Sequence, residues 1–421
     1  MTDLKAMLTD VEEGIAPAPE DYESVRSKGA RTLRRRRFAS AFGGLSAVVA
    51  VVVVASLVDV AAFRKSDQAP AGPGAANSWS EWSPIATAPL EARYDAHAVW
   101  TGDEFLIWGG SGQDQAFQDG AGYSPTSDEW RELPRAPIAQ GGDRTSVWTG
   151  RELLLWGGET TATGHSRPDD GAGYNPSSNR WREIEQSPVW SLAGHAAVWT
   201  GSEMIVWGGV DNFDTGAAYD PARKSWREFS PAPIAGRSQH AAVWTGNELI
   251  VWGGRGEYGE PLADGAAYSP DSDTWRILSE APLAARTGAR VVWTGSKMIV
   301  WGGDARTPGA DLEPLSDGAI YDPQTDSWTP IADAPTTSVL LTEEPRALWT
   351  GDRMVVFGVD SAPHAYEPAT DTWMALPAHE TLPRRGMVVA WTGGEVLAWG
   401  GASGEDFELL ASGIRTRLQA P

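Results

Sequence analysis

The sequence predicts an all-β fold in which one four-stranded unit is repeated seven times around a closed ring, preceded by one transmembrane α-helix. Three observations predict it. The phrase AAVWTGNELIVWGG at residues 241–254 has near-copies throughout residues 97–401. A second motif, in which a Tyr precedes a Trp by seven residues, follows six of the seven copies. An uncharged segment of 21 residues lies near the N-terminus.

The uncharged segment Phe38–Val58 is long enough, at ~1.5 Å per residue, for a helix that spans the ~30 Å hydrocarbon layer. Arg34–Arg37 precede it, and this asymmetry predicts a cytoplasmic N-terminus with the rest of the chain outside. The expected parts are a cytoplasmic tail (1–37), a transmembrane helix (38–63), a flexible Pro/Gly/Ala-rich linker (64–76) and the ring (77–421). The protein is therefore expected in the cell membrane. The alternative is a cleaved signal peptide with Val60–Ala62 as its cleavage site.

Each repeat predicts two β-hairpins, with strands a to d. Apolar runs flank Thr-Gly-Asn-Glu in the first hairpin, where Gly supplies a positive φ, and Pro-Asp-Ser-Asp in the second. Such a unit cannot bury both of its faces alone, so neighbouring units must stack. We call the tryptophans of the first hairpin the WTG tryptophans: Trp100, Trp148, Trp199, Trp244, Trp293, Trp349 and Trp391.

A strand that ends in Gly-Gly, followed by Tyr and Trp at fixed spacing, resembles the kelch repeat, the blade of β-propellers such as the central domain of galactose oxidase. The resemblance covers roughly residues 77–421 and implies a seven-bladed propeller. Phe357-Gly358-Val359 breaks the Gly-Gly pair, so blade six should be the least regular. The N-terminal tail resembles the short tails of bacterial membrane proteins, some of which regulate sigma factors.

The spacing also predicts how the ring closes. No second motif follows Trp391, whereas Trp82 lies 18 residues before Trp100, the usual spacing from a second-motif Trp to the next WTG. Residues 78–88 should therefore supply the outer strand of blade seven, whose inner strands come from residues 386–418. Pairing of the two ends would remove exposed strand edges.

The two faces of the predicted ring differ. The a–b and c–d turns are nearly invariant and lie on one face, which we call the constant face. The d–a and b–c connections lie on the other, the variable-loop face, where the gap from the WGG aromatic to the next Tyr ranges from 9 to 20 residues. Loops not dictated by blade packing are the expected place for a binding site. Trp190, in a d–a loop, has no counterpart in other blades and is either a ligand contact or a plug between blades.

Basic side chains recur just before each WTG motif, where strand a enters the ring. They predict a positive collar able to hold a carboxylate or an acidic sugar. Similar residues in kelch repeats pair with neighbouring blades, which is the structural alternative. The Asp-Gly pairs before strand c, at Asp119, Asp170, Asp264 and Asp317, are expected to form turns. The candidate ligand-binding residues are Trp190, Tyr94, His97, Arg144, His195, Arg237, His240, Arg286, Arg290, Glu344, Arg346 and Arg384.

Composition excludes several functions. Residues 77–421 carry 24 basic and 47 acidic side chains, which disfavours nucleic acid as a partner. The absence of Cys excludes thiolate metal sites and the Cys-linked tyrosine of galactose oxidase. His97, His195 and His240 come from three blades, a poor arrangement for a metal, so no metal or cofactor is expected.

No catalytic motif is present, and a binding or scaffolding module for a protein or a glycan is the favoured function. The alternative is a carbohydrate-acting enzyme of the mutarotase or lyase type. In that case Glu343 or Glu344 would act as acid and base beside Arg346.

Overall fold

The computed structural model describes residues 78–138, 141–142, 144–160, 170–189, 193–209, 214–305, 313–336, 347–357, 362–404 and 407–419. The predicted tail, transmembrane segment 38–63 and linker lie outside these residues. Among the described residues no helix is long and apolar enough to cross a membrane.

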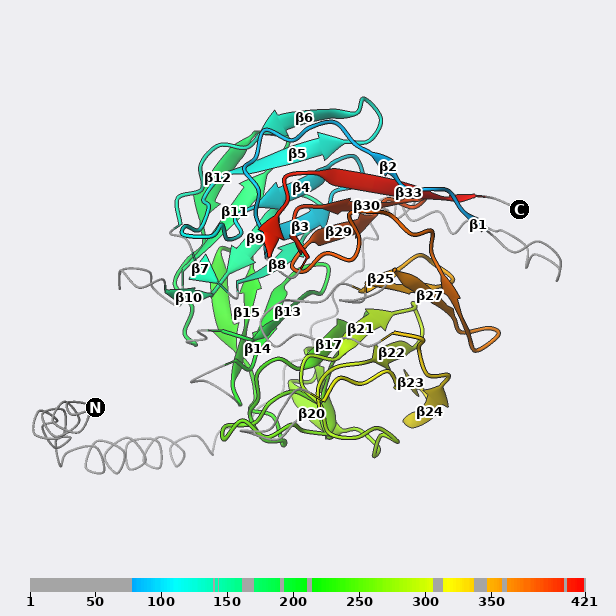
Figure 1. Ribbon diagram of the computed structural model, residues 1–421. Coiled ribbons are helices and arrows are strands. Elements are labelled where there is room, and N and C mark those ends of the chain that lie inside the picture. Colours follow the sequence, from blue (N-terminus) through cyan, green and yellow to red (C-terminus); the bar gives the residue numbers. More distant parts are fainter. Residues whose placement is uncertain are drawn as a thin grey trace, which may run out of the picture. The chain divides into compact units, whose positions relative to one another are not determined.

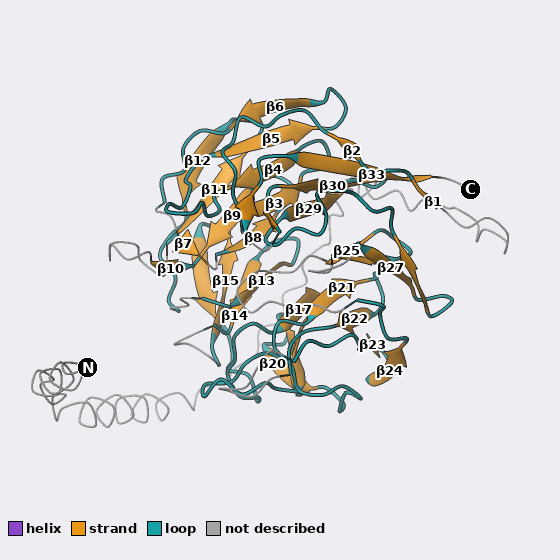
Figure 2. Cartoon of the chain, in the orientation of Figure 1, coloured by secondary structure: helices purple, strands orange, loops and turns teal. Residues whose placement is uncertain are grey.

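The described chain forms the seven predicted blades: six four-stranded antiparallel sheets, and a seventh sheet whose outer strand is divided into two short strands (Figures 1 and 2). Within each blade the strands follow one another from the innermost strand a to the outermost strand d. Blades one to three are β3 (His97–Trp100), β4 (Phe105–Trp108), β5 (Gly120–Ser124) and β6 (Glu129–Glu132); β8 (Thr145–Trp148), β9 (Leu153–Trp156), β11 (Gly171–Asn175) and β12 (Arg180–Glu183); and β13 (Ala196–Trp199), β14 (Met204–Trp207), β15 (Gly216–Asp220) and β16 (Ser225–Glu228).

Blades four to six continue the pattern. They are β17 (Ala241–Trp244), β18 (Leu249–Trp252), β19 (Gly265–Ser269) and β20 (Thr274–Ile277); β21 (Arg290–Trp293), β22 (Met298–Trp301), β23 (Gly318–Asp322) and β24 (Ser327–Ile331); and β25 (Ala347–Trp349), β26 (Met354–Val356), β27 (His364–Glu367) and β28 (Thr372–Ala375). The two inner strands of blade six are a residue shorter than those of blades one to five, where Phe357 interrupts the usual motif.

Blade four shows why the first hairpin recurs. The Thr245 hydroxyl oxygen accepts hydrogen bonds from the backbone N–H groups of Asn247 at 3.2 Å and Glu248 at 2.9 Å. Gly246 has a φ of 103°, which a residue with a Cβ rarely adopts. The Thr-Gly pair therefore fixes a tight turn, and the same hydroxyl-to-backbone contacts recur at the other a–b turns, as in Thr101 and Thr149.

The apolar core lies between the blades, in seven clusters that each join two neighbours. At the junction of blades three and four, the ring centroids of Trp207 and Trp275 are 5.5 Å apart. Trp275 also donates its indole N–H to the carbonyl oxygen of Ser230, at 2.8 Å, in the preceding d–a connection. The WGG tryptophan thus fills the junction while the second-motif tryptophan bonds across it.

Blade seven closes the ring by combining both ends of the described chain. It contains β29 (Val388–Trp391), β30 (Glu395–Trp399) and β33 (Gly413–Gln419). β33 pairs with β30 on one side and with β1 (Ser78–Trp79) and β2 (Ser83–Pro84) on the other. Figure 1 shows the blue first strands beside the red last strand. β29 in turn lies next to β3 of blade one, which completes the circle of inner strands.

Candidate functional site

On the variable-loop face, connections that belong to adjacent blades are joined by short β-bridges. The b–c connection of blade four, residues 253–264, pairs through Arg255 with Ser238 in the preceding d–a connection. Its Leu262 pairs with Arg286 in the following one. In blade two, the short strands β7 (Gly141–Gly142) and β10 (Glu159–Thr160) make a similar link, and β31 (Ala402–Ser403) pairs with β32 (Glu408–Leu409) in blade seven. Among the described residues, the connections around these blades are therefore joined to one another on this face.

Six of the arginines that precede the WTG motifs are buried: Arg93, Arg144, Arg237, Arg286, Arg290 and Arg384. All of these except Arg290 bind the start of strand c or the turn before it. Arg237 is representative. Its guanidinium donates to the carbonyl oxygens of Ala235 at 2.9 Å and Gly253 at 3.0 Å, and its ion pair with Asp264 is 2.9 Å long. A fully buried charge is stable only when it is paired and hydrogen-bonded in this way.

The same arrangement recurs with small changes. Arg93 pairs with Asp119 at 2.7 Å and Arg286 with Asp317 at 2.8 Å, while Arg144 reaches Asp170 at 2.7 Å. Arg384 instead donates to Ser412 and Thr381. The Asp-Gly aspartates, expected only to form turns, are thus the counterions of the arginines.

Arg93, Arg237 and Arg286 also join two blades. The backbone of Arg93 bonds to Leu410 and Gly401 of blade seven, whereas its side chain bonds within blade one. The backbone of Arg286 likewise bonds to Gly254 of blade four, and its side chain to blade five. These side chains therefore form clamps between blades, and a ligand anion would reach them only by displacing an aspartate. Ligand binding by them stays a prediction.

Two predicted histidines lie between blades: His195 is buried, and His240 is partly buried with both ring nitrogens enclosed. His195 lies 2.8 Å from the Thr145 hydroxyl and packs edge-on against Trp156, and His240 packs in the same way against Trp207. Burial, with the charge of Arg144 nearby, lowers the pKa of His195 to about 3. Burial, with Arg237 and His195, lowers the pKa of His240 to about 3. Both rings are therefore neutral at pH 7.

The remaining candidates are dispersed. His97 stacks on Trp108 with ring centroids 6.2 Å apart, and Tyr94 packs edge-on against Phe407 at 5.1 Å. Arg290 is buried and donates to the carbonyl oxygen of Gly288. Among the described residues no three His, Asp or Glu side chains are grouped as metal ligands. Trp190, Glu344 and Arg346 lie outside the described residues.

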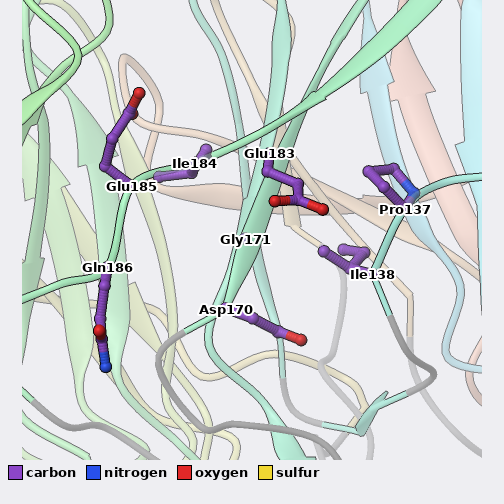
Figure 3. A pocket seen from close by; sticks show the side chains of 8 residues that line it. All are labelled: Pro137, Ile138, Asp170, Gly171, Glu183, Ile184, Glu185 and Gln186. Carbon is purple, nitrogen blue, oxygen red and sulfur yellow. The ribbon is translucent and has the colours of Figure 1, made fainter.

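A pocket of about 440 Å³ opens on the variable-loop face at blade two (Figure 3). Its wall combines the apolar side chains of Pro137, Ile138 and Ile184 with polar ones. Figure 3 shows Asp170 and Glu183 directed toward Pro137 and Ile138, and Glu185 directed away from them. The pocket is lined by Pro137, Ile138, Asp170, Gly171, Glu183, Ile184, Glu185 and Gln186.

Sequence reasoning missed Glu183 and Glu185. Glu183 belongs to a Trp-Arg-Glu phrase that recurs in three blades and so carries no sign of a site. Glu185 accepts a hydrogen bond from the Tyr219 hydroxyl at 2.6 Å, and its backbone carbonyl accepts the N–H of Trp226. In the other blades the residue that accepts the second-motif N–H is Ala, Pro or Ser. An acidic residue at this position of the repeat was therefore the sequence signal that pointed to Glu185.

We expect Arg237→Ala to lower the free energy of unfolding by about 3 kcal/mol, because it leaves a cavity and an unpaired buried carbonyl at Gly253. Urea unfolding of the full chain measures the change. Arg223→Ala is the control, since this side chain is 80% exposed and pairs with Asp220 at the surface, a contact worth less than about 1 kcal/mol. Equal losses in the two variants would contradict the clamp.

The histidines predict a dependence of stability on pH. The folded pKa of His195, about 3, lies below its unfolded value of about 6.5, so only the unfolded state gains a proton between these values. The neutral His195 ring therefore makes its full contribution to the free energy of unfolding above about pH 6.5. This contribution is lost as pH falls toward 3, by about 1.4 kcal/mol per pH unit. Urea unfolding at pH 7.5, 5.5 and 4.5 should give a shallower slope for His195→Gln than for the unchanged protein. Parallel slopes would refute the assignment.

Comparison with known proteins agrees with this architecture. Residues 194–401 match the family model of the KLHDC2/KLHL20/DRC7 Kelch-repeats domain, and residues 74–266 match that of the Attractin/LZTR1 beta-propeller. No curated protein matches the sequence. Among 1110 chains of solved structures that match is the one titled "Structure of YjhT". It is 14% identical with a TM-score of 0.53, and the match covers 79% of this chain and 97% of that one, a likeness of fold alone. With seven kelch-type blades closed into a ring, the chain belongs to the kelch-repeat β-propeller family.

Proposed function

We propose that the chain is a membrane-anchored, extracytoplasmic binding module that holds a protein partner on its variable-loop face. The observation that carries the proposal is the contrast between the two faces. One is built from near-identical turns, while the other combines connections of different length with the pocket beside Asp170 and Glu183. Variable loops on a rigid scaffold are the common location of binding surfaces.

An ordered loop on this face favours a protein over a small ligand. Tyr258 is 82% exposed at the tip of the b–c connection of blade four. Its backbone N–H bonds to the Glu260 carboxylate, and Gly256 and Glu260 are joined by a backbone bond. A tyrosine held in the open by a preformed loop can enter a partner's pocket with little loss of entropy. The acidic side chains around it and at the pocket favour a partner with basic groups.

Ser78 pairs with Gln419 at the end of β33, which lies at the constant face. The predicted anchor, residues 38–63, supports placement of the ring outside the cell membrane. A glycan is the second ligand class for the same face. The described residues offer no observation that favours the enzymatic alternative, whose candidates Glu344 and Arg346 lie outside them.

A photo-crosslinking side chain tests the proposed face. The full chain with Tyr258→benzoylphenylalanine, expressed and irradiated in its own cells, should give a discrete adduct with one protein. Ser296→benzoylphenylalanine, exposed in an a–b turn of the constant face, is the matched control and should give none. Adducts from Ser296 alone would place the partner on the wrong face and sink the proposal.

The membrane anchor has its own test. The full chain should stay with the membrane fraction after alkaline carbonate extraction, because a spanning helix is not released by disruption of surface contacts. Protease added to spheroplasts should remove the ring and leave an N-terminal epitope tag intact. Release of a chain lacking its N-terminal tag would instead show a cleaved signal peptide.

A further inference from the structure

The WTG tryptophans form a second surface, on the constant face. Each is the last residue of an innermost strand, directly before an a–b turn, as Trp199 is in β13 and Trp244 in β17. The innermost strands lie side by side around the whole ring, from β3 to β29 and back to β3. The WTG tryptophans therefore encircle the axis of the ring at its constant-face end.

These tryptophans differ from the other two sets in the repeat. The described WGG tryptophans are at most 1% exposed. Second-motif tryptophans donate their N–H to a carbonyl of the preceding blade, as Trp226 does to Glu185 at 2.6 Å. The WTG tryptophans are half-buried, as the second-motif tryptophans are, and each packs against the junction with the preceding blade. Among the described residues none of their N–H groups has a hydrogen-bond partner, and none is buried. These N–H groups therefore face solvent.

An exposed polar group follows nearly every WTG tryptophan three residues later. It is a carboxylate at Asp103, an amide at Asn247 and a hydroxyl at Ser202 and Ser296. Every blade except the seventh, which has Gly394 at this position, thus presents part of an indole, a solvent-accessible N–H donor and a neighbouring polar side chain. Packing between blades explains the buried part of each indole. It leaves the N–H of all seven at the surface, whereas the second-motif N–H groups bond to a neighbouring blade.

This combination is suited to sugars. The C–H face of a pyranose stacks on an aromatic ring, while its hydroxyl groups accept from an N–H and bond to nearby polar side chains. The constant face carries exposed acidic residues, Asp103, Asp352, Asp273 and Asp371 among them, which disfavour anionic sugars. We propose that the WTG tryptophans bind a neutral polysaccharide through several weak, equivalent contacts that gain strength from multivalency. The proposal is independent of the variable-loop face.

Affinity electrophoresis of the full chain in native gels tests this inference. The gels contain galactomannan, xyloglucan or soluble starch, with polygalacturonate as the anionic comparison and a polyoxyethylene detergent that carries no sugar. At least one neutral polymer should retard the protein, and polygalacturonate should not. The triple variant Trp199→Phe, Trp244→Phe, Trp293→Phe keeps an aromatic ring at each junction but loses three N–H donors. It should bind about ten-fold more weakly.

Two controls separate binding from folding. Trp226→Phe removes an N–H that is already bonded internally, so it should lower stability without changing retardation. Tyr258→Ala alters the other face and should also leave retardation unchanged, whatever becomes of the protein partner. The inference is overturned if no neutral polymer retards the chain. It is equally overturned if polygalacturonate retards it as strongly, or if the folded triple variant is retarded like the unchanged protein.

Discussion

The contact between neighbouring blades is the interaction on which the rest of the structure depends. A four-stranded blade is apolar on both sides, and its buried inner residues, such as Ile250 and Val251, face different neighbours. No blade can therefore be stable alone. The apolar sides of all seven blades are covered only when the last junction closes the ring. The tryptophans that bond across the junctions and the arginines that clamp several of them both serve this single requirement.

The arginine clamps show how a charged residue that recurs in a repeat can stabilise the fold instead of binding a ligand. A buried guanidinium is costly unless every donor is matched, and Arg237 matches its donors with two carbonyls and a carboxylate. That arrangement fixes where strand c begins, because the counterion Asp264 immediately precedes it. The connections beyond this point are then free to differ in length. Uniform clamps thus allow a non-uniform surface above them, and the two faces can serve different ligands.

Most of the fold was predictable because it is periodic. The spacing of Trp, Gly and Tyr predicts the strands, the hairpins and the number of blades without knowledge of distant contacts. The role of the arginines was not predictable in this way, since Arg237 and Asp264 lie 27 residues apart. The repeats nevertheless show that the arginine and the aspartate vary together. Where Thr215 replaces the aspartate, no arginine occupies the clamp position. Where Ser412 replaces it, Arg384 donates to the serine hydroxyl instead. The pocket at Glu185 was not predictable, because its shape depends on the directions of side chains, which the spacing of motifs does not determine.

The shared blade seven sets the order in which the chain can be completed. β1 and β2 belong to the first segment of the ring to be synthesised, yet their partner β33 is among the last. Until β33 emerges, the first strands have no sheet to join and the junction between blades seven and one stays open. During synthesis the nascent ring is therefore an unclosed arc with two exposed apolar sides.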